Sequence, residues 1–217
     1  SINQQLLARD YSPECINLFT DNTTLLPKRN IIIEAVKSLA AKTKPNDLLL
    51  FYYSGHGDEA TGQSYLVAQD ASYDNLGRTA VPVAKIVEIM RQARARAKVL
   101  ILDACHSGAK LGSKGAKPMS AEFINRVFKQ AEGLVILSSC KQAEFSYEVR
   151  QQGVFTRFLL QGLSGQADRD QKGFVTVQDI HRHVSDGVLR WAKRNKLEQT
   201  PTLQCEVVGD IILAAYR

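Results

Sequence analysis

The sequence lacks the features that would place it in a membrane or in an oxidising compartment. Its four cysteines, Cys15, Cys105, Cys140 and Cys205, are at least 35 residues apart, which excludes CxxC redox pairs and paired-CxxC zinc sites. No apolar run approaches the ~18 residues that a membrane helix needs. The first residues do not combine a basic segment with an apolar stretch, so we expect no export signal. A core of 217 residues does not need disulfides. We therefore expect a cytoplasmic protein without a membrane partner, in which the cysteines other than Cys105 are small apolar packing residues.

The charge is not extreme either, which limits the classes of partner. Lysine and arginine number 28 and aspartate and glutamate 22, which gives a net charge of +6. One basic cluster at 91–98 has no aromatic residues interleaved with it, so it is typical of a solvated face and not of a nucleic-acid surface. Apolar residues make up 44% of the chain and charged residues 23%, as in a folded domain. We expect a single domain over 1–217 and no nucleic-acid partner.

Strand-like and helix-like segments alternate along the chain. Continuous apolar runs at 48–53, 99–105 and 134–140 predict three strands that are buried on both faces. The other expected elements are helices at 1–9, 30–42, 82–97, 120–131, 155–163 and 176–195, and short strands at 15–20, 64–69, 203–208 and 211–215. This alternation predicts an α/β fold with a mostly parallel sheet. Ligands bind beyond the carboxyl ends of the strands in such sheets, so the residues that close the apolar runs are candidates for a site.

A histidine and a cysteine lie at the ends of two of these runs, each flanked by glycine. His56 lies in SGHG after the first run, and Cys105 lies in DACHSG at the end of the second. Adjacent parallel strands are ~4.8 Å apart, so side chains that leave their ends can meet. An imidazole can take the proton of a thiol and later protonate a leaving amine. The N–H groups of Gly57 and Cys105 could bind the oxyanion of such an acyl-transfer reaction.

These two motifs, in this order and with 49 residues from the histidine to the cysteine, resemble those of the caspase-fold cysteine peptidases. The resemblance is to metacaspases and their bacterial relatives, and it extends to 138–148, to 153–170 and to QTP at 199–201. It implies a three-layer sandwich with a mostly parallel central sheet between helices, and a cysteine endopeptidase whose catalytic dyad is His56 and Cys105. The alternatives are that both residues only cap strands, or that the chain is a catalytically inactive interaction module.

Two further residues share the direction of the dyad. Residues i and i+2 of a strand point the same way, so Asp103 accompanies Cys105 and Ser54 accompanies His56. The resemblance to metacaspases implies that Asp103 and Ser54 line a pocket for Arg or Lys at P1, the substrate residue before the cleaved bond. It also implies another pocket acid upstream, for which Asp21 is the candidate. The alternatives are that Asp103 only caps backbone groups, or that the protease is directed to Asp, as in animal caspases.

The loop at 109–119 is basic and contains Lys110, Lys114 and Lys117. Caspase relatives are processed in this region, so the resemblance implies a junction here between a large and a small part. If P1 is basic, the loop is a candidate for self-cleavage. A solvated basic loop without such a role is the alternative.

One segment partly matches a calcium-binding loop. Asp168, Asp170, Gly173 and Asp179 fall at positions 1, 3, 6 and 12 of the pattern, but position 5 is Lys172. A lysine cannot serve as a calcium ligand, so a turn followed by a helix cap is the favoured interpretation. We expect no required cofactor, and Asp168 and Asp170 are the residues that calcium would use.

The resemblance also raises an expectation about the sheet. Family members normally begin with an apolar strand ahead of the first helix, near the middle of the sheet, whereas this chain opens with SINQQLLAR. A sheet without that strand would leave backbone groups unpaired. We therefore expect a strand from a missing N-terminal segment or from a partner domain to complete it.

Overall fold

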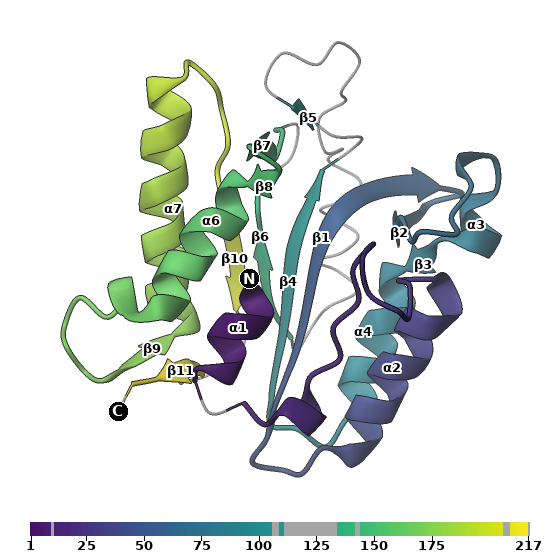
Figure 1. Ribbon diagram of the computed structural model, residues 1–217, viewed down its shortest axis with the longest axis horizontal. Coiled ribbons are helices and arrows are strands. Elements are labelled where there is room, and N and C mark those ends of the chain that lie inside the picture. The colour runs from purple at the N-terminus through teal and green to yellow at the C-terminus, as the bar shows by residue number, and fades with distance from the viewer. Residues whose placement is uncertain (10, 106–108, 111–133, 142–143, 206–208, 217) are drawn as a thin grey trace.

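The centre of the fold is a six-stranded sheet whose middle strands are parallel (Figure 1). The computed structural model describes residues 1–9, 11–105, 109–110, 134–141, 144–205 and 209–216. The strands follow one another across the sheet in the order β10 (Thr202–Cys205), β6 (Val135–Ser138), β4 (Ala97–Cys105), β1 (Leu48–Ala60), β2 (Gln63–Leu66) and β3 (Val81–Pro82). The pairs β6–β4 and β4–β1 are parallel, whereas β10, β2 and β3 join antiparallel at the two sides.

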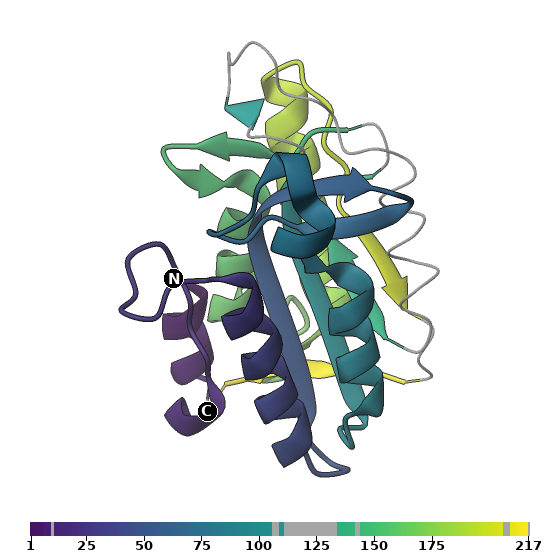
Figure 2. The ribbon, with the colours of Figure 1, turned by 90° about the vertical axis from the view of Figure 1, so that its right-hand side faces the viewer.

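Helices cover both faces of this sheet, as Figure 2 shows from the side. Those on one face are α2 (Arg29–Lys42) and α4 (Val83–Gln92), and those on the other are α1 (Ile2–Leu7), α6 (Val154–Gln161) and α7 (Val177–Arg194). The alternation of side chains along β4 explains the two layers. Leu100 and Leu102 pack under α2 and α4, while Val99 and Ile101 pack under α6 and α7. The expected α/β class, a central parallel sheet between helices, is confirmed.

The remaining elements are two small sheets and several short helical turns. One sheet contains β5 (Ala109–Lys110), β7 (Tyr147–Val149) and β8 (Gln152–Gly153), and the other pairs β9 (Phe174–Thr176) with β11 (Ile212–Ala215). The helical turns are η1 (Pro13–Cys15), η2 (Tyr73–Asn75), α3 (Leu76–Thr79) and η3 (Gly162–Gln166). Among the described residues, none of the helices combines the length and the apolar character that crossing a membrane requires.

Several expected elements differ in the structure. The prediction of a strand at 15–20 was wrong, because residues 16–20 have no regular secondary structure. The segment leads into a turn in which Thr23 Oγ1 accepts the N–H of Thr20 at 2.9 Å. Such local hydrogen bonds compete with strand pairing. The helix expected at 82–97 ends at Gln92, because β4 already begins at Ala97. The two strands expected near the C-terminus join β6 and β9 and not each other, and the helix expected at 120–131 lies outside the described residues.

The cysteines outside the proposed dyad do not all pack in the core. Cys140 is buried among the residues under α2 and α4, as expected of a small apolar side chain. Cys205 is half-buried, and Cys15, the last residue of η1, is exposed. The expectation for Cys15 was therefore wrong, because η1 lies at the surface with no buried residues of its own.

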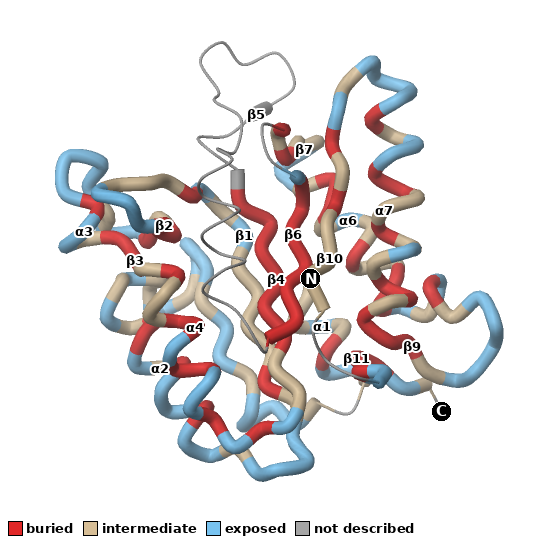
Figure 3. The backbone as a smooth tube through the Cα atoms, turned by 180° about the vertical axis from the view of Figure 1, so that it is seen from behind, coloured by how far each residue is buried: buried red, intermediate tan, exposed pale blue. Residues whose placement is uncertain are grey.

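The apolar residues of β1 are less well covered than those of its neighbour β4 (Figure 3). Residues 99–102 of β4 are at most 2% exposed, whereas Leu48 and residues 50–53 of β1 are only half-buried. The difference arises at the edge of β1 that faces away from β4, where a neighbouring strand is lacking over most of the apolar run. β2 pairs with β1 only over 57–60, so within the described chain no strand pairs with that edge along 48–52. The expectation that this strand is buried on both faces is met only in part.

Candidate active site

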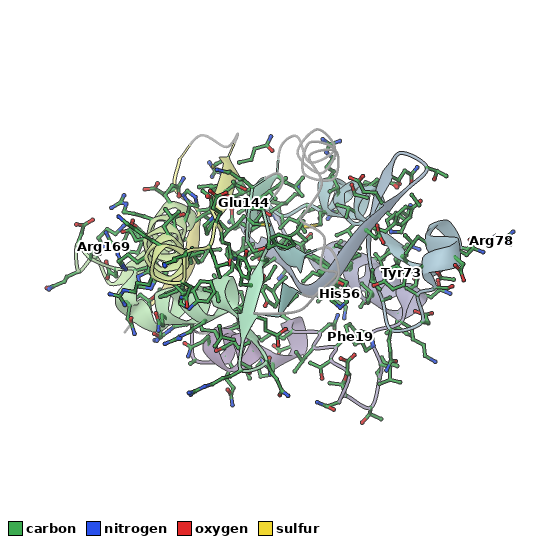
Figure 4. The ribbon with its side chains drawn as sticks, turned by 90° about the horizontal axis from the view of Figure 1, so that it is seen from above. Phe19, His56, Tyr73, Arg78, Glu144 and Arg169 are labelled. Carbon is green, nitrogen blue, oxygen red and sulfur yellow. The ribbon has the colours of Figure 1, made fainter. Side chains whose placement is uncertain are left out.

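The pairing of β1 with β4 brings the two predicted catalytic positions to one edge of the sheet. The strands stay in parallel register from Leu48 opposite Ala97 to His56 opposite Cys105. Paired positions on neighbouring strands are ~4.8 Å apart, so two residues that are 49 positions apart in sequence become neighbours. Ser54 lies opposite Asp103 in the same register. Figure 4 looks down onto this edge and labels His56, whose side chain is exposed.

The side chain of Tyr53 lies along β1 and is hydrogen-bonded to the backbone of His56. Tyr53 Oη lies 2.7 Å from the carbonyl oxygen of His56 and 3.0 Å from that of Val67, so its hydroxyl donates into this pair. A Cβ on Gly55 would lie 2.6 Å from the same phenol oxygen. Glycine at this position therefore leaves the room that the tyrosine needs. Because the Val67 N–H also donates to the His56 carbonyl, the backbone that carries the imidazole is fixed from two sides.

The SGHG segment does not turn away from the strand. The apolar run predicted a strand that ends at residue 53, but β1 continues through this motif to Ala60 and pairs with β2. Neither Gly55 nor Gly57 has a positive φ, so the motif is extended and the predicted end of the strand was wrong. Opposed residues in an antiparallel pair of strands alternate between hydrogen-bonded and non-hydrogen-bonded pairs. The Val67 N–H donates to the His56 carbonyl, so the next pair, Gly57 and Leu66, is of the non-hydrogen-bonded kind, in which the N–H groups point away from the partner strand. The Gly57 N–H is therefore directed away from β2, toward the side of the sheet where β4 lies.

Asp103 is a buried carboxylate with two hydroxyl donors. The residue is 5% exposed. Ser146 Oγ donates to Oδ1 at 2.8 Å, and Thr156 Oγ1 donates to Oδ2. Burial raises the pKa of Asp103 above its ordinary value, and the hydrogen bonds from Thr156 and Ser146 oppose that rise. The acid is thus held in one place, opposite Ser54 in the sheet.

Sequence reasoning did not single out the residues that hold Asp103. Ser146 comes from the segment after β6, and Thr156 comes from the first turn of α6. Gly153, the residue before that helix, packs so closely that a Cβ there would overlap the carboxylate. A further hydroxyl, that of Tyr52 in β1, lies 2.7 Å from Thr156 Oγ1. The similarity of 138–148 and 153–170 to the family was the signal that could have identified the first three residues.

The other predicted site residues have no described contact with Asp103 or Ser54, or lie outside the described residues. Asp21 is exposed in the turn that follows residue 20, and no contact described for it reaches Asp103 or Ser54. Lys110 belongs to β5, which pairs with β7. Residues 111–119, with Lys114 and Lys117, are not among the described residues.

The segment that partly matches a calcium loop is a turn and a helix cap in this structure. The Asp168 carboxylate accepts backbone N–H groups of the turn, including that of Lys172 at 2.9 Å. Lys172 Nζ lies 2.6 Å from Asp179 Oδ2, so the carboxylate at position 12 of the pattern is paired with an ammonium group. Asp179 also forms a capping box with Thr176 at the start of α7, and Asp170 is exposed. Within the described residues, no group of three or more His, Cys, Asp or Glu could hold a metal ion.

Comparisons with known proteins find a bacterial protease and a fungal metacaspase among the similar sequences. A protein named as a probable protease from a Desulfuromonadales bacterium is 27% identical over 177 residues, which cover 75% of this chain and 22% of that protein. Metacaspase-1 of Candida albicans is 38% identical over 66 residues, which cover 29% of this chain and 15% of that protein. The chain therefore spans less than a quarter of either relative.

A solved structure shares the fold. The crystal structure of a protein from Geobacter sulfurreducens matches with a TM-score of 0.53 at 17% identity, over 84% of this chain and 76% of that one. The family model described as the caspase domain matches residues 12–211. That range contains the whole six-stranded sheet and both motifs that meet where β1 and β4 pair. The chain belongs to the caspase-domain family.

Proposed function

We propose that this domain is a cysteine endopeptidase that hydrolyses peptide bonds after Arg or Lys. The observation that carries the proposal is the register of β1 and β4, which sets His56 opposite Cys105. Membership of the caspase-domain family supports a thiol peptidase in general. The similarity to metacaspase-1 proteins of several fungi supports the narrower choice of a metacaspase-like enzyme. The proposed reaction requires no cofactor.

In the proposed reaction the imidazole of His56 accepts the thiol proton of Cys105, and the sulfur attacks the carbonyl carbon of the scissile bond. The oxyanion is stabilised by the N–H groups of Gly57 and Cys105, each donor contributing ~3 kcal/mol in comparable sites. His56 then gives the proton to the leaving amine, and a thioester remains on Cys105. A water molecule attacks the thioester with His56 as base, which releases the carboxylate product and restores the thiol.

The acid beside the nucleophile supports a basic P1 residue. Asp103 is held on one strand and Ser54 lies opposite it on the next. A guanidinium or ammonium group in a pocket formed there would be attracted to the carboxylate, whereas the side chain of an Asp substrate would be repelled. This charge preference favours cleavage after Arg or Lys over cleavage after Asp.

The same specificity extends to the protein itself. A protease that cleaves after basic residues finds Lys110, Lys114 and Lys117 in its own segment 109–119, which the sequence predicts to be a loop beyond β5. Exposed loops rich in small and polar residues are preferred sites of proteolysis. We therefore include self-processing after a lysine of this loop in the proposed function.

A peptide panel tests the nucleophile and the specificity together. Peptides with Arg, Lys or Asp at P1 are incubated with the native protein, with Cys105→Ala and with Cys15→Ala, each with and without calcium. We expect Cys15→Ala, which changes an exposed cysteine, to cleave the Arg and Lys peptides as fast as the native protein does. Cys105→Ala should lose at least about 1,000-fold in kcat/KM, since it removes the attacking atom. Mass spectrometry of the incubated proteins should show cleavage within 109–119 in the native chain and in Cys15→Ala, but not in Cys105→Ala.

The nucleophile, the basic specificity and the activity itself each have a contradicting result in that panel. Equal turnover by Cys105→Ala would reject Cys105 as the nucleophile. Cleavage after Asp would overturn the basic specificity. A folded native protein that cleaves nothing, with or without calcium, would favour the inactive interaction module.

Asp103→Asn tests the pocket. The substitution keeps the size of the side chain, and the hydroxyls of Ser146 and Thr156 can rotate to accept from an amide. We expect a thermal unfolding midpoint close to that of the native protein and a loss of about 100-fold in kcat/KM for Arg peptides, because the substrate cation loses its counter-charge. Unchanged kinetics would remove Asp103 from the pocket, whatever the midpoint.

We also propose that an extended apolar strand from outside residues 1–217 pairs with the open edge of β1. The support is the incomplete cover of Leu48 and residues 50–53 and the lack of a paired strand along 48–52 in the described chain. Amide hydrogen exchange measures this edge directly. In the 217-residue chain we expect alternate amides of 48–52 to exchange far faster than those of 99–102 in β4. Equal protection of the two segments would contradict an open edge.

A further inference from the structure

Each of the two hydroxyls that donate to Asp103 receives a hydrogen bond from a further residue, so two branches of hydrogen bonds lead to the carboxylate, one through Thr156 and one through Ser146. Ser146 and Thr156 each have one hydroxyl hydrogen, and each uses it on a different oxygen of the carboxylate. On the Thr156 branch, the Tyr52 hydroxyl lies 2.7 Å from Thr156 Oγ1. Because the threonine hydrogen is already committed, Tyr52 must be the donor in that contact. Burial, together with the nearby charge of Asp103, raises the pKa of Tyr52 to about 12, so the phenol keeps its hydrogen at neutral pH.

The Ser146 branch ends on Gln199, which is fully buried. Its Oε1 accepts the backbone N–H of Tyr147 at 3.1 Å. A backbone N–H can only donate, so this contact fixes which end of the amide is oxygen. The Nε2 end therefore faces Ser139 and Ser146, and it donates to the Ser139 carbonyl at 3.0 Å and to Ser146 Oγ at 3.3 Å.

The orientation of Gln199 sets the direction of the serine hydroxyl. Ser146 Oγ receives a hydrogen from Gln199, so its own hydrogen is left to point at Asp103 Oδ1. Gln199 lies 53 residues after Ser146 in the chain and makes no direct hydrogen bond to Asp103 among those described. Its described side-chain hydrogen bond toward the acid therefore runs through the hydroxyl of Ser146.

We propose that Gln199 and Ser146 are positioning residues that hold the Asp103 carboxylate toward the P1 cation and thereby set the selectivity for basic substrates. The inference rests on the proposed function, because it assigns to this pair a share in that specificity. Neither residue is proposed to touch the substrate or the reacting atoms. A buried carboxylate that keeps one orientation attracts a cation at a fixed place, and one that loses a donor can rotate or take up a proton.

Two substitutions interrupt the branch at different points. Ser146→Ala removes the inner donor. Gln199→Glu keeps the size of the side chain and the acceptor for Tyr147, but it places an acceptor where Ser146 Oγ now receives a hydrogen. The serine hydrogen would then turn toward the introduced carboxylate and leave Asp103. Thr200→Val is the matched control, because Thr200 follows Gln199 directly and its hydroxyl donates to Glu144 at 2.9 Å and not to this branch.

The readout is the ratio of kcat/KM for two peptides that differ only in Arg or citrulline at P1, since citrulline has nearly the shape of arginine without its charge. We expect Ser146→Ala and Gln199→Glu to lower kcat/KM for the Arg peptide about 10-fold, the size of one lost hydrogen bond to a charged group. The citrulline peptide should be cleaved at the native rate. Thr200→Val should leave both rates unchanged. In the Asp103→Asn background, Ser146→Ala should cause no further loss, as expected of residues that act through one another.

The outcomes separate this inference from the proposed function. If the native protein does not prefer Arg to citrulline, the basic specificity itself fails and the inference fails with it. If the native protein does prefer Arg, but both variants keep the native ratio or lose the two peptides equally, only the positioning role is overturned. The thermal unfolding midpoint of each variant reports any general loss of structure. Such a loss would lower the rates for the Arg and the citrulline peptide together, and that result would also count against the positioning role.

Discussion

The parallel pairing of β1 with β4 is the interaction on which the candidate site depends. It runs without a shift from Leu48 opposite Ala97 to His56 opposite Cys105. In a parallel ladder a slip of one residue would move every side chain of one strand to the other face of the sheet. The apolar residues along these strands separate into two cores, one on each face, so burial strongly disfavours such a slip. The packing that stabilises the domain therefore also places a histidine and a cysteine side by side.

The polar residues at this edge show how the fold keeps charge and hydrogen bonds in place next to that core. Asp103 is buried, which is costly for a carboxylate unless donors surround it. The donors come from the segment after β6 and from α6, which are distant in sequence but adjacent to the end of β4. On the β1 side, Tyr53 uses the space left by Gly55 to hold the His56 backbone. The two strands are thus fixed by separate sets of contacts at the positions proposed for catalysis and for specificity.

Much of the fold could be predicted because it depends on local patterns. Continuous apolar runs identified β1, β4 and β6, and the stripe at 30–42 identified α2. The prediction of a strand at 15–20 was wrong because the sequence pattern does not show the side-chain hydrogen bonds that end this segment in a turn. The motifs around His56 and Cys105 named the candidate site, whereas Ser146, Thr156 and Gln199 lie in segments that resemble the family without a local pattern that assigns a role to each residue. Their importance comes only from tertiary contacts across 43 to 53 residues of chain.

The central claim is that the imidazole of His56 acts on the sulfur of Cys105. The rate of alkylation by iodoacetamide at neutral pH, read by peptide mass spectrometry, measures this without any substrate. Cys15 is exposed and serves as the reference within the same molecule. The account predicts that Cys105 reacts about 10-fold faster than Cys15 and that His56→Ala removes this advantage. Equal rates at the two cysteines, unaffected by His56→Ala, would contradict it.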